Sequence, residues 1–287
     1  MIQSANVLLP TGIEVRSGVD RATFEREYLY PQRPVVLNDV LREWPALSTW
    51  TPEALRARFA EREFVVKGTT IRFGELIDRL LAEDPSRPAP YLNQEPISQR
   101  LPELFADVSP MPWCVQPNWL PGRYSHPFIN HWFNMGAEVE LFIGAAGSGL
   151  HQLHYDVMHF NGFSMQIYGR KRFFLYPPEQ TRFLYATDNI SQVNDILQPD
   201  LERFPLFAQA CPLVHDLAPG ELLFIPPGWW HDTRILNHSL SVSANTACRS
   251  NWADIRRDVC GSVSLVKRVP AWIYLTLIGW FRRVTRG

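Results

Sequence analysis

The feature that most constrains the fold is a series of short apolar segments between residues 139 and 246, separated by strong turn signals. Gly, Pro, Asn and Ser mark the turns, at residues 145–149, 169–171, 218–220, 226–228 and 237–239. Short strands with a turn every roughly 8–12 residues are typical of an antiparallel sandwich or barrel. The predicted strands are 139–143, 163–168, 172–176, 221–225, 229–236 and 240–246.

Three residues in this region have the types and spacing of a metal site. His154 and Asp156 are two positions apart, and side chains two apart in an extended segment point to the same face. His231 stands at a strand start, after the turn at 226–228. Two histidines and a carboxylate form the facial triad of non-heme Fe(II) oxygenases, which leaves other iron positions open. We therefore predict His154, Asp156 and His231 as metal ligands; the alternative is a surface strand pair and a structural histidine.

The segments LHYD, GFSMQIYGRKRFFLYPPEQ and APGELLFIPPGWWHDTRILNHSLSVSANT carry a family resemblance. The chain is similar over residues 15–255 to the cupin-like JmjC oxygenases that use 2-oxoglutarate. Within that family it resembles the asparaginyl hydroxylases of hypoxia-inducible factor, and the lead-in RPVVLNDVLREWPALSTWTPEALRARF is similar too. The resemblance implies an all-β core with the double-stranded β-helix (cupin, jelly-roll) fold, flanking helices and a C-terminal helix.

The resemblance also implies residues that hold 2-oxoglutarate. Lys171 matches a lysine that pairs with the distal carboxylate, and a buried dicarboxylate needs such a cation. Tyr91 matches a tyrosine that hydrogen-bonds the same carboxylate, and Asn245 an asparagine lining the metal pocket. Asn161 is expected to supply the family's amide after the aspartate, and His151 replaces a hydroxyl residue that contacts the co-substrate. The alternatives are a solvated turn cation for Lys171 and structural roles for the others.

The remaining histidines are not predicted as ligands. His159 follows the ligand pair closely and is expected to be a pocket residue or a satisfied polar group beside the ligands. Four others belong to no motif and are expected to be structural or exposed: His126, His131, His215 and His238.

Length and composition favour one catalytic domain. A chain of 287 residues buries a large core, and we expect a catalytic domain at 1–260, with lead-in helices at 19–29, 52–62 and 72–81. The net charge of −1 gives no basic field for nucleic acid, so no nucleic-acid partner is expected. Four scattered cysteines and a start without signal-peptide features predict a reducing, cytoplasmic location.

The C-terminal segment 261–287 is predicted to be an apolar helix with basic flanks. Residues 269–281 carry no charge and lie between Lys267–Arg268 and Arg282–Arg283. An uncharged run this short does not reach the roughly 20 residues of a membrane-spanning helix. We expect homodimerisation through this helix, with peripheral membrane contact or packing against the chain's own domain as alternatives.

The predicted activity is hydroxylation of a peptide or protein side chain, or of a small molecule, with Fe(II) and 2-oxoglutarate. Demethylation through hydroxylation of an N-methyl group uses the same chemistry and stays open. The competing classes are a non-catalytic cupin-like binding module and a metal cupin enzyme that does not use 2-oxoglutarate. Lys171 distinguishes a 2-oxoglutarate oxygenase from the last of these classes, because only a dicarboxylate co-substrate needs a cation in the pocket.

Overall fold

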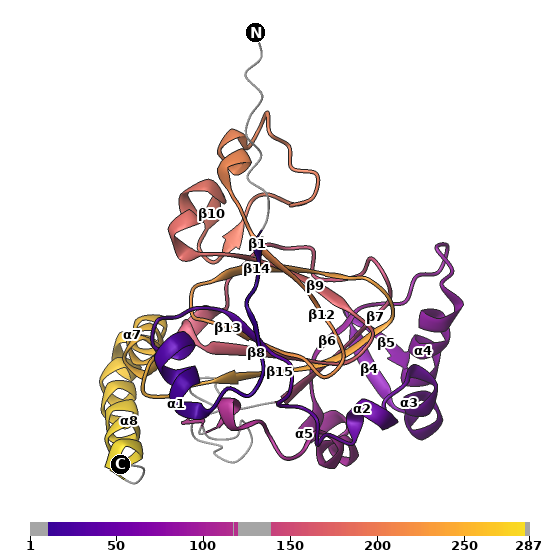
Figure 1. The fold of residues 1–287 in the computed structure, drawn as a ribbon, viewed down its shortest axis with the longest axis horizontal. Coiled ribbons are helices and arrows are strands. Elements are labelled where there is room, and N and C mark those ends of the chain that lie inside the picture. The colour runs from indigo at the N-terminus through magenta and orange to yellow at the C-terminus, as the bar shows by residue number, and fades with distance from the viewer. Residues whose placement is uncertain (1–10, 117, 120–138, 285–287) are drawn as a thin grey trace.

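A computed structural model describes residues 11–116, 118–119 and 139–284, and in it two β-sheets face each other with helices outside them (Figure 1). The smaller sheet has the order β1 (Thr11–Gly12), β12 (Leu213–Leu217), β9 (Lys171–Tyr176), β14 (Trp230–Ile235). The larger sheet has the order β2 (Val15–Arg16), β3 (Val35–Leu37), β13 (Leu222–Ile225), β8 (Asn161–Tyr168), β15 (Ser239–Thr246), β7 (Val139–Gly144), β6 (Leu92–Pro96).

The strands predicted between residues 139 and 246 are confirmed, with ends that move by one or two residues. Their pairing is antiparallel, and β8 lies between β13 and β15 in the larger sheet. Strands β8 and β9 join at Gly169, whose φ of +68° and close approach to the His238 carbonyl exclude a side chain. The chain therefore passes from the larger sheet to the smaller one between β8 and β9, and it passes between the sheets again from β12 to β13, β13 to β14 and β14 to β15.

The lead-in forms helices that cover the outer face of the larger sheet. They are α1 (Arg21–Phe24) with its π-helical continuation (Glu25–Leu29), α2 (Ala46–Thr49), α3 (Pro52–Phe59), α4 (Phe73–Ala82) and α5 (Ile97–Arg100). Thr51 caps α3 through the Ala54 amide, and Pro52 follows at the first helical position. The helices predicted at 52–62 and 72–81 are confirmed; the one at 19–29 is present but changes to π geometry at Glu25.

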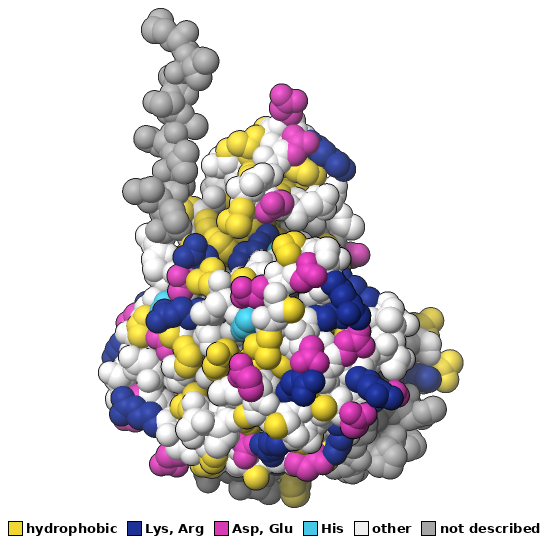
Figure 2. Space-filling view, turned by 90° about the vertical axis from the view of Figure 1, so that its right-hand side faces the viewer, with side chains coloured by type: hydrophobic (Ala, Val, Ile, Leu, Met, Phe, Trp, Pro, Cys, Tyr) yellow, Lys and Arg dark blue, Asp and Glu magenta, His cyan; other side chains and the backbone are white. Residues whose placement is uncertain are grey.

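Between α3 and α4 the chain forms a hairpin of β4 (Glu63–Val66) and β5 (Thr69–Arg72). Basic and acidic side chains are interspersed on this side of the molecule (Figure 2). One such pair joins the helices, because Arg56 donates to Asp78 through Nε at 2.6 Å. Mixed charge of this kind is typical of a solvated face.

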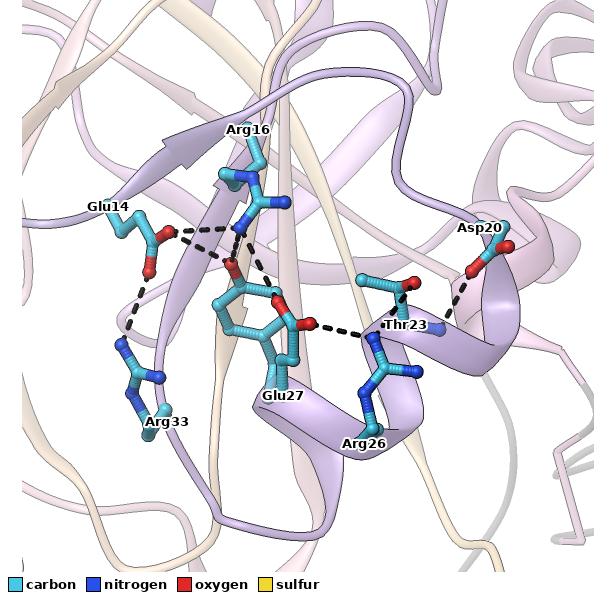
Figure 3. A network of polar contacts seen from close by, with 8 residues as sticks. Glu14, Arg16, Asp20, Thr23, Arg26, Glu27 and Arg33 are labelled. Carbon is cyan, nitrogen blue, oxygen red and sulfur yellow. Dashed lines mark hydrogen bonds and ion pairs between the residues drawn. The ribbon is translucent and has the colours of Figure 1, made fainter.

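A polar cluster joins Glu14 and Arg16 to the π-helical segment that continues α1 (Figure 3). Arg16 of β2 donates to the Tyr28 hydroxyl at 2.8 Å and to Glu14 at 3.2 Å, and it lies 3.5 Å from Glu27. Arg33 donates to the other oxygen of Glu14 at 3.2 Å. The charged members are more than a third exposed, so these pairs orient the lead-in more than they stabilise it.

A lobe between β9 and β12 was not predicted from the sequence. It contains two short 3-10 helices (Pro178–Phe183 and Pro205–Gln209) and the pair β10 (Ala186–Thr187) and β11 (Ile190–Ser191). Figure 1 shows it standing above the smaller sheet. It has its own apolar cluster, which includes Phe204, Phe207 and Trp230, and Ile190 forms a β-bridge with His154. The lobe thus supports the backbone of a predicted ligand.

The chain ends in α7 (Trp252–Ser262) and α8 (Leu265–Val284), which pack together at the end of the sheets opposite α3 and α4 (Figure 1). Gly279 lies so close to Trp252 that a Cβ would stand 2.5 Å from the indole nitrogen. The outer side of α8 exposes large apolar side chains, among them Val266, Val269, Trp272, Leu277 and Trp280. Within the described part of the chain, no helix has the length and apolar character needed to cross a membrane.

Candidate metal centre and co-substrate pocket

The structure brings His154, Asp156 and His231 together. One ligand atom from each lies within 4.8 Å of the other two, as a single bound ion requires. Backbone hydrogen bonds hold the two histidines side by side. The His154 amide donates to the His231 carbonyl at 3.1 Å, and the His231 amide donates to the His154 carbonyl at 2.6 Å. Their rings lie 4.4 Å apart at 54°. The smaller sheet therefore delivers both imidazoles to one point.

Both imidazoles are oriented by backbone carbonyls. His154 Nδ1 lies 2.7 Å from the Gln152 carbonyl, and His231 Nδ1 lies 3.1 Å from the Trp229 carbonyl. A carbonyl only accepts, so Nδ1 carries the proton and Nε2 presents its lone pair. Burial, followed by the charge of His231, lowers the pKa of His154, which favours the neutral ring. Two neutral imidazoles and a carboxylate are the donor set that suits Fe(II).

A cavity of about 100 Å³ opens beside these ligands. Both sheets line it, and its walls include the triad together with Tyr91, Lys171 and Asn245. Asn245 of β15 lies directly opposite Gly162 of β8, and Ser243 lies opposite Ser164, so these positions form successive layers of the wall. The structure thus places three of the five predicted co-substrate residues in one cavity with the predicted ligands.

Lys171 is a buried cation at this cavity. Its side chain is 4% exposed, its Nζ donates to Ser241 Oγ at 2.9 Å, and it lies 5.2 Å from the Phe142 ring centroid. Burial lowers the pKa of Lys171 to about 7. Among the described residues no carboxylate pairs with it. A buried ammonium without a counter-ion is costly, so the cavity is built to receive an anion.

Tyr91 also faces this space and is 9% exposed. Burial raises the pKa of its phenol, so the hydroxyl stays protonated and can donate to an anion. Its ring lies 6.4 Å from that of Phe142, the same ring that contacts Lys171. Lys171, Tyr91 and Phe142 therefore form a floor with two donors.

Asn161 does not reach this cavity. It is 1% exposed and lines a separate cavity of about 410 Å³ with Cys248 and Trp119, and its amide nitrogen lies 3.4 Å from Cys248 Sγ. The residue that faces the ligands is Gly162, where a Cβ would stand 3.2 Å from Asp156 Oδ2. Successive side chains of a strand face opposite sides. Because Asn161 is one residue before Gly162, its amide points away from the predicted metal site.

His151 is also outside the cavity lining. It is exposed, has a φ of +50°, and lies in the loop before the ligands. His159 lies outside the lining too, with its Nδ1 2.5 Å from Asp258. His215 Nε2 and His238 Nε2 lie 2.9 Å from carboxylate oxygens of Glu221 and Glu83, as expected for structural histidines. His126 and His131 fall outside the described residues.

Several wall residues were missed from the sequence. Phe142, Ser164, Thr233 and Ser243 line the cavity, and Ser241 holds Lys171. Their strands were predicted, and inward alternation from Asn245 through Ser243 to Ser241 would have found the serines. Phe142 and Thr233 required knowledge of which strand lies across the cavity, which the sequence does not state.

The family model of the cupin-like domain matches residues 21–254. Lysine-specific demethylase 8 of Xenopus tropicalis is 34% identical over 240 residues, which cover 77% of this chain and 49% of that protein. Lysine-specific demethylase JMJ30 of Arabidopsis thaliana is 30% identical over 249 residues, 80% of this chain and 54% of that protein. The chain therefore spans about half the length of these relatives.

A further relative is covered more fully. tRNA wybutosine-synthesizing protein 5 of Danio rerio is 32% identical over 252 residues, 80% of this chain and 74% of that protein. With the two-sheet core and the His-Asp-His site, these matches identify the class: the chain belongs to the cupin-like JmjC family of Fe(II)- and 2-oxoglutarate-dependent oxygenases.

The residues present fit both cofactors of that family. The His-Asp-His site offers the three donors that Fe(II) takes, and the unpaired ammonium of Lys171 suits a carboxylate of 2-oxoglutarate. The predictions of a metal-binding oxygenase domain, Fe(II) and 2-oxoglutarate are thereby confirmed.

The pKa of Lys171 leads to a prediction on pH. Burial alone gives Lys171 a pKa of about 7, and a bound carboxylate must raise this pKa. Below pH 7 Lys171 is already charged; above pH 7 binding must take up a proton. We expect the dissociation constant of 2-oxoglutarate to rise with pH above 7, by up to about tenfold per pH unit. Calorimetry on anaerobic, iron-loaded protein in buffers of different ionisation enthalpy measures this uptake. Equal affinity at pH 6 and pH 8.5, with no proton uptake at pH 8.5, would contradict it.

Proposed function

We propose that this chain is an Fe(II)- and 2-oxoglutarate-dependent hydroxylase that acts on a side chain of a peptide or protein. The observation that carries the proposal is the buried, unpaired ammonium of Lys171 in the same cavity as the His154, Asp156 and His231 triad. A binding module does not need the triad, and a metal cupin that does not use 2-oxoglutarate does not need the cation.

The roles of the residues follow from their places. His154, Asp156 and His231 would hold one face of the iron and leave the cavity side open. Lys171 and Tyr91 would bind the distal carboxylate of 2-oxoglutarate and so orient its keto acid end toward the triad. Iron and 2-oxoglutarate together supply the oxidising chemistry when both are bound. The apolar wall formed by Phe142, Phe173 and Ile225 would keep bulk water from the reacting atoms.

The size of the cavity supports a peptide or protein substrate. A space of about 100 Å³ is too small for the co-substrate together with a whole substrate molecule, so most of the substrate must lie outside it. An extended chain that presents one side chain meets this condition. Two of the relatives described above carry the name lysine-specific demethylase, and hydroxylation of an N-methyl carbon is the first step of such a reaction. Demethylation is thus the second candidate.

The decisive experiment measures succinate formed from 2-oxoglutarate on addition of Fe(II), with peptide pools and with small molecules. Mass spectrometry then reads each peptide for gain of one oxygen or loss of a methyl group. We expect peptide-stimulated turnover with an oxygen gain. Turnover that only small molecules stimulate would overturn the peptide assignment, and no succinate under any condition would overturn the oxygenase itself.

We propose that the core is a double-stranded β-helix. The order β13-β8-β15-β7 in the larger sheet faces β12-β9-β14 in the smaller one, and the segment at His154 extends the smaller sheet beside β14. Each layer of the core then has four strands. In this assignment the catalytic domain spans 1–260, and the helical segment 261–287 is added to it.

We also propose that α8 mediates a homodimer. Val266, Val269, Leu277 and Trp280 are between 59% and 87% exposed on one side of the helix, and apolar patches of this kind mark interaction surfaces. Deleting residues 265–287 is expected to convert a dimer to a monomer, as measured by light scattering. A full-length monomer that binds anionic vesicles would favour the membrane alternative, and a full-length monomer that ignores them would favour intramolecular packing.

A further inference from the structure

The three predicted ligands are not held equally. His154 and His231 are each fixed by a backbone carbonyl at Nδ1. Within the described residues, Asp156 has no hydrogen bond to its carboxylate; its Oδ1 lies 3.9 Å from His231 Nε2, which is the metal-facing atom. The side chain is 35% exposed. The direction of this carboxylate therefore depends on the path of the backbone that follows it.

That backbone is strained. Asp156 is extended, with φ −65° and ψ 129°, and the 3-10 turn Val157–His159 follows it. Met158 has φ 65° and ψ 16°, and His159 has φ 52°. Two successive residues with side chains in the left-handed region are unfavourable in isolation. Contacts from elsewhere must keep this turn in place.

Helix α7 supplies the polar contacts. Asn251, which is 1% exposed at the start of α7, donates to the His159 carbonyl at 2.9 Å and to the Thr246 carbonyl at 3.1 Å. Asp258, two turns further along the helix, accepts from His159 Nδ1 at 2.5 Å. Helix α7 thus holds this turn at two points of His159, the backbone carbonyl and the imidazole ring. Asn251 also joins the turn to the end of β15, next to Asn245.

Apolar contacts complete the attachment. Met158 and Phe160, on either side of His159, pack against the cluster that α7 and α8 form around Trp252, Ile255 and Leu275. The turn that follows Asp156 is therefore clamped to the C-terminal helices, whereas His154 and His231 belong to the smaller sheet.

We propose that His159, through its bond to Asp258, is a positioning residue for Asp156, so that α7 sets the affinity of the site for its metal. The inference rests on the proposed metal role of the triad. Asp258 fixes the ring, the ring fixes the turn, and the turn aims the carboxylate at the point that Nε2 of His154 and His231 face. Either partner of the bond can then be removed without touching a ligand.

The test uses the full-length apo-protein and titrates it with Co(II), read by calorimetry and by visible absorption. Asp258→Leu and His159→Leu each remove the bond from one side. We expect each to raise the dissociation constant of Co(II) about tenfold, the lower end of the effect of partners outside a ligand set, and to change the spectrum of the saturated protein. Asp258→Asn should stay within about threefold, because its amide oxygen still accepts.

The matched control is Asp254→Leu. Asp254 lies one turn earlier in α7 and pairs with Arg257 at 2.9 Å, and the same arginine lies 3.8 Å from Asp258. Because this change leaves the bond between Asp258 and His159 in place, it should lower the melting temperature of the apo-protein slightly and leave Co(II) binding unchanged. A purely structural role for Asp258 would give the same pattern as Asp254.

The outcomes separate the inference from the proposed function. A wild-type protein that does not bind Co(II), or whose binding survives Asp156→Ala, would refute the metal role of the triad. The positioning role alone would be overturned if either folded Leu variant bound Co(II) with the wild-type dissociation constant. It would also be overturned if Asp254→Leu raised that constant as much as the two Leu variants do. Circular dichroism of the apo-protein shows which variants fold, and the two Leu variants attack opposite partners of one bond.

Discussion

Asp156→Ala and His154→Ala are each expected to leave the protein folded and almost without iron. Each change removes one of three proposed ligands whose donor atoms lie within 4.8 Å of one another. Loss of a group outside a ligand set already costs on the order of 10- to 100-fold in metal affinity, so loss of a ligand should exceed about 100-fold. Neither side chain fills the main core, because both are only partly buried.

Elemental analysis after dialysis against Fe(II) under anaerobic conditions measures this effect, and circular dichroism confirms the fold. Glu202→Ala is the matched control, since Glu202 is an exposed carboxylate of the lobe. We expect iron equal to wild type in the control and iron close to background in the two ligand variants. Wild-type iron content in either ligand variant would remove that residue from the site.

Lys171→Ala is expected to weaken 2-oxoglutarate binding much more than iron binding. The ammonium is 4% exposed and has Ser241 as its hydrogen-bond partner, so the incoming carboxylate would be its counter-ion. A hydrogen bond to a charged group contributes about 1.5–3 kcal/mol, and each 1.4 kcal/mol is a factor of about ten. The KM for 2-oxoglutarate should therefore rise at least about tenfold.

A graded series makes this result specific. Ser241→Ala removes a neutral neighbour of Lys171 and should raise the KM less than Lys171→Ala does. Both variants should keep wild-type iron content, because neither residue is a ligand. If titration calorimetry gave one 2-oxoglutarate affinity for wild type and Lys171→Ala, the pocket would hold its dicarboxylate in another way.

What the sequence determined by itself is local. Turn residues between the apolar segments defined the strands of the core, because Gly readily adopts the positive φ of tight turns and Pro restricts its own φ. The two-residue spacing of His154 and Asp156 implied a shared face, since the period of a strand is two. Lys171 followed from its place in a motif, and its burial in the structure agrees with that role.

Only the tertiary structure decided the features that depend on pairing between distant segments. One residue of register determined that Gly162, and not Asn161, faces the metal site, because a shift of one exchanges the two faces of a strand. The strands of the lobe between β9 and β12 are too short to show an alternation of apolar and polar residues. The local sequence therefore did not predict the β-bridge between Ile190 of the lobe and His154. The bond from His159 to Asp258 joins residues far apart in sequence, and only the packing of α7 against the ligand turn brings them within 2.5 Å. The spacing of residues within one segment determines which side chains share a face of that segment, whereas contacts between distant segments are determined by the packing of the whole core.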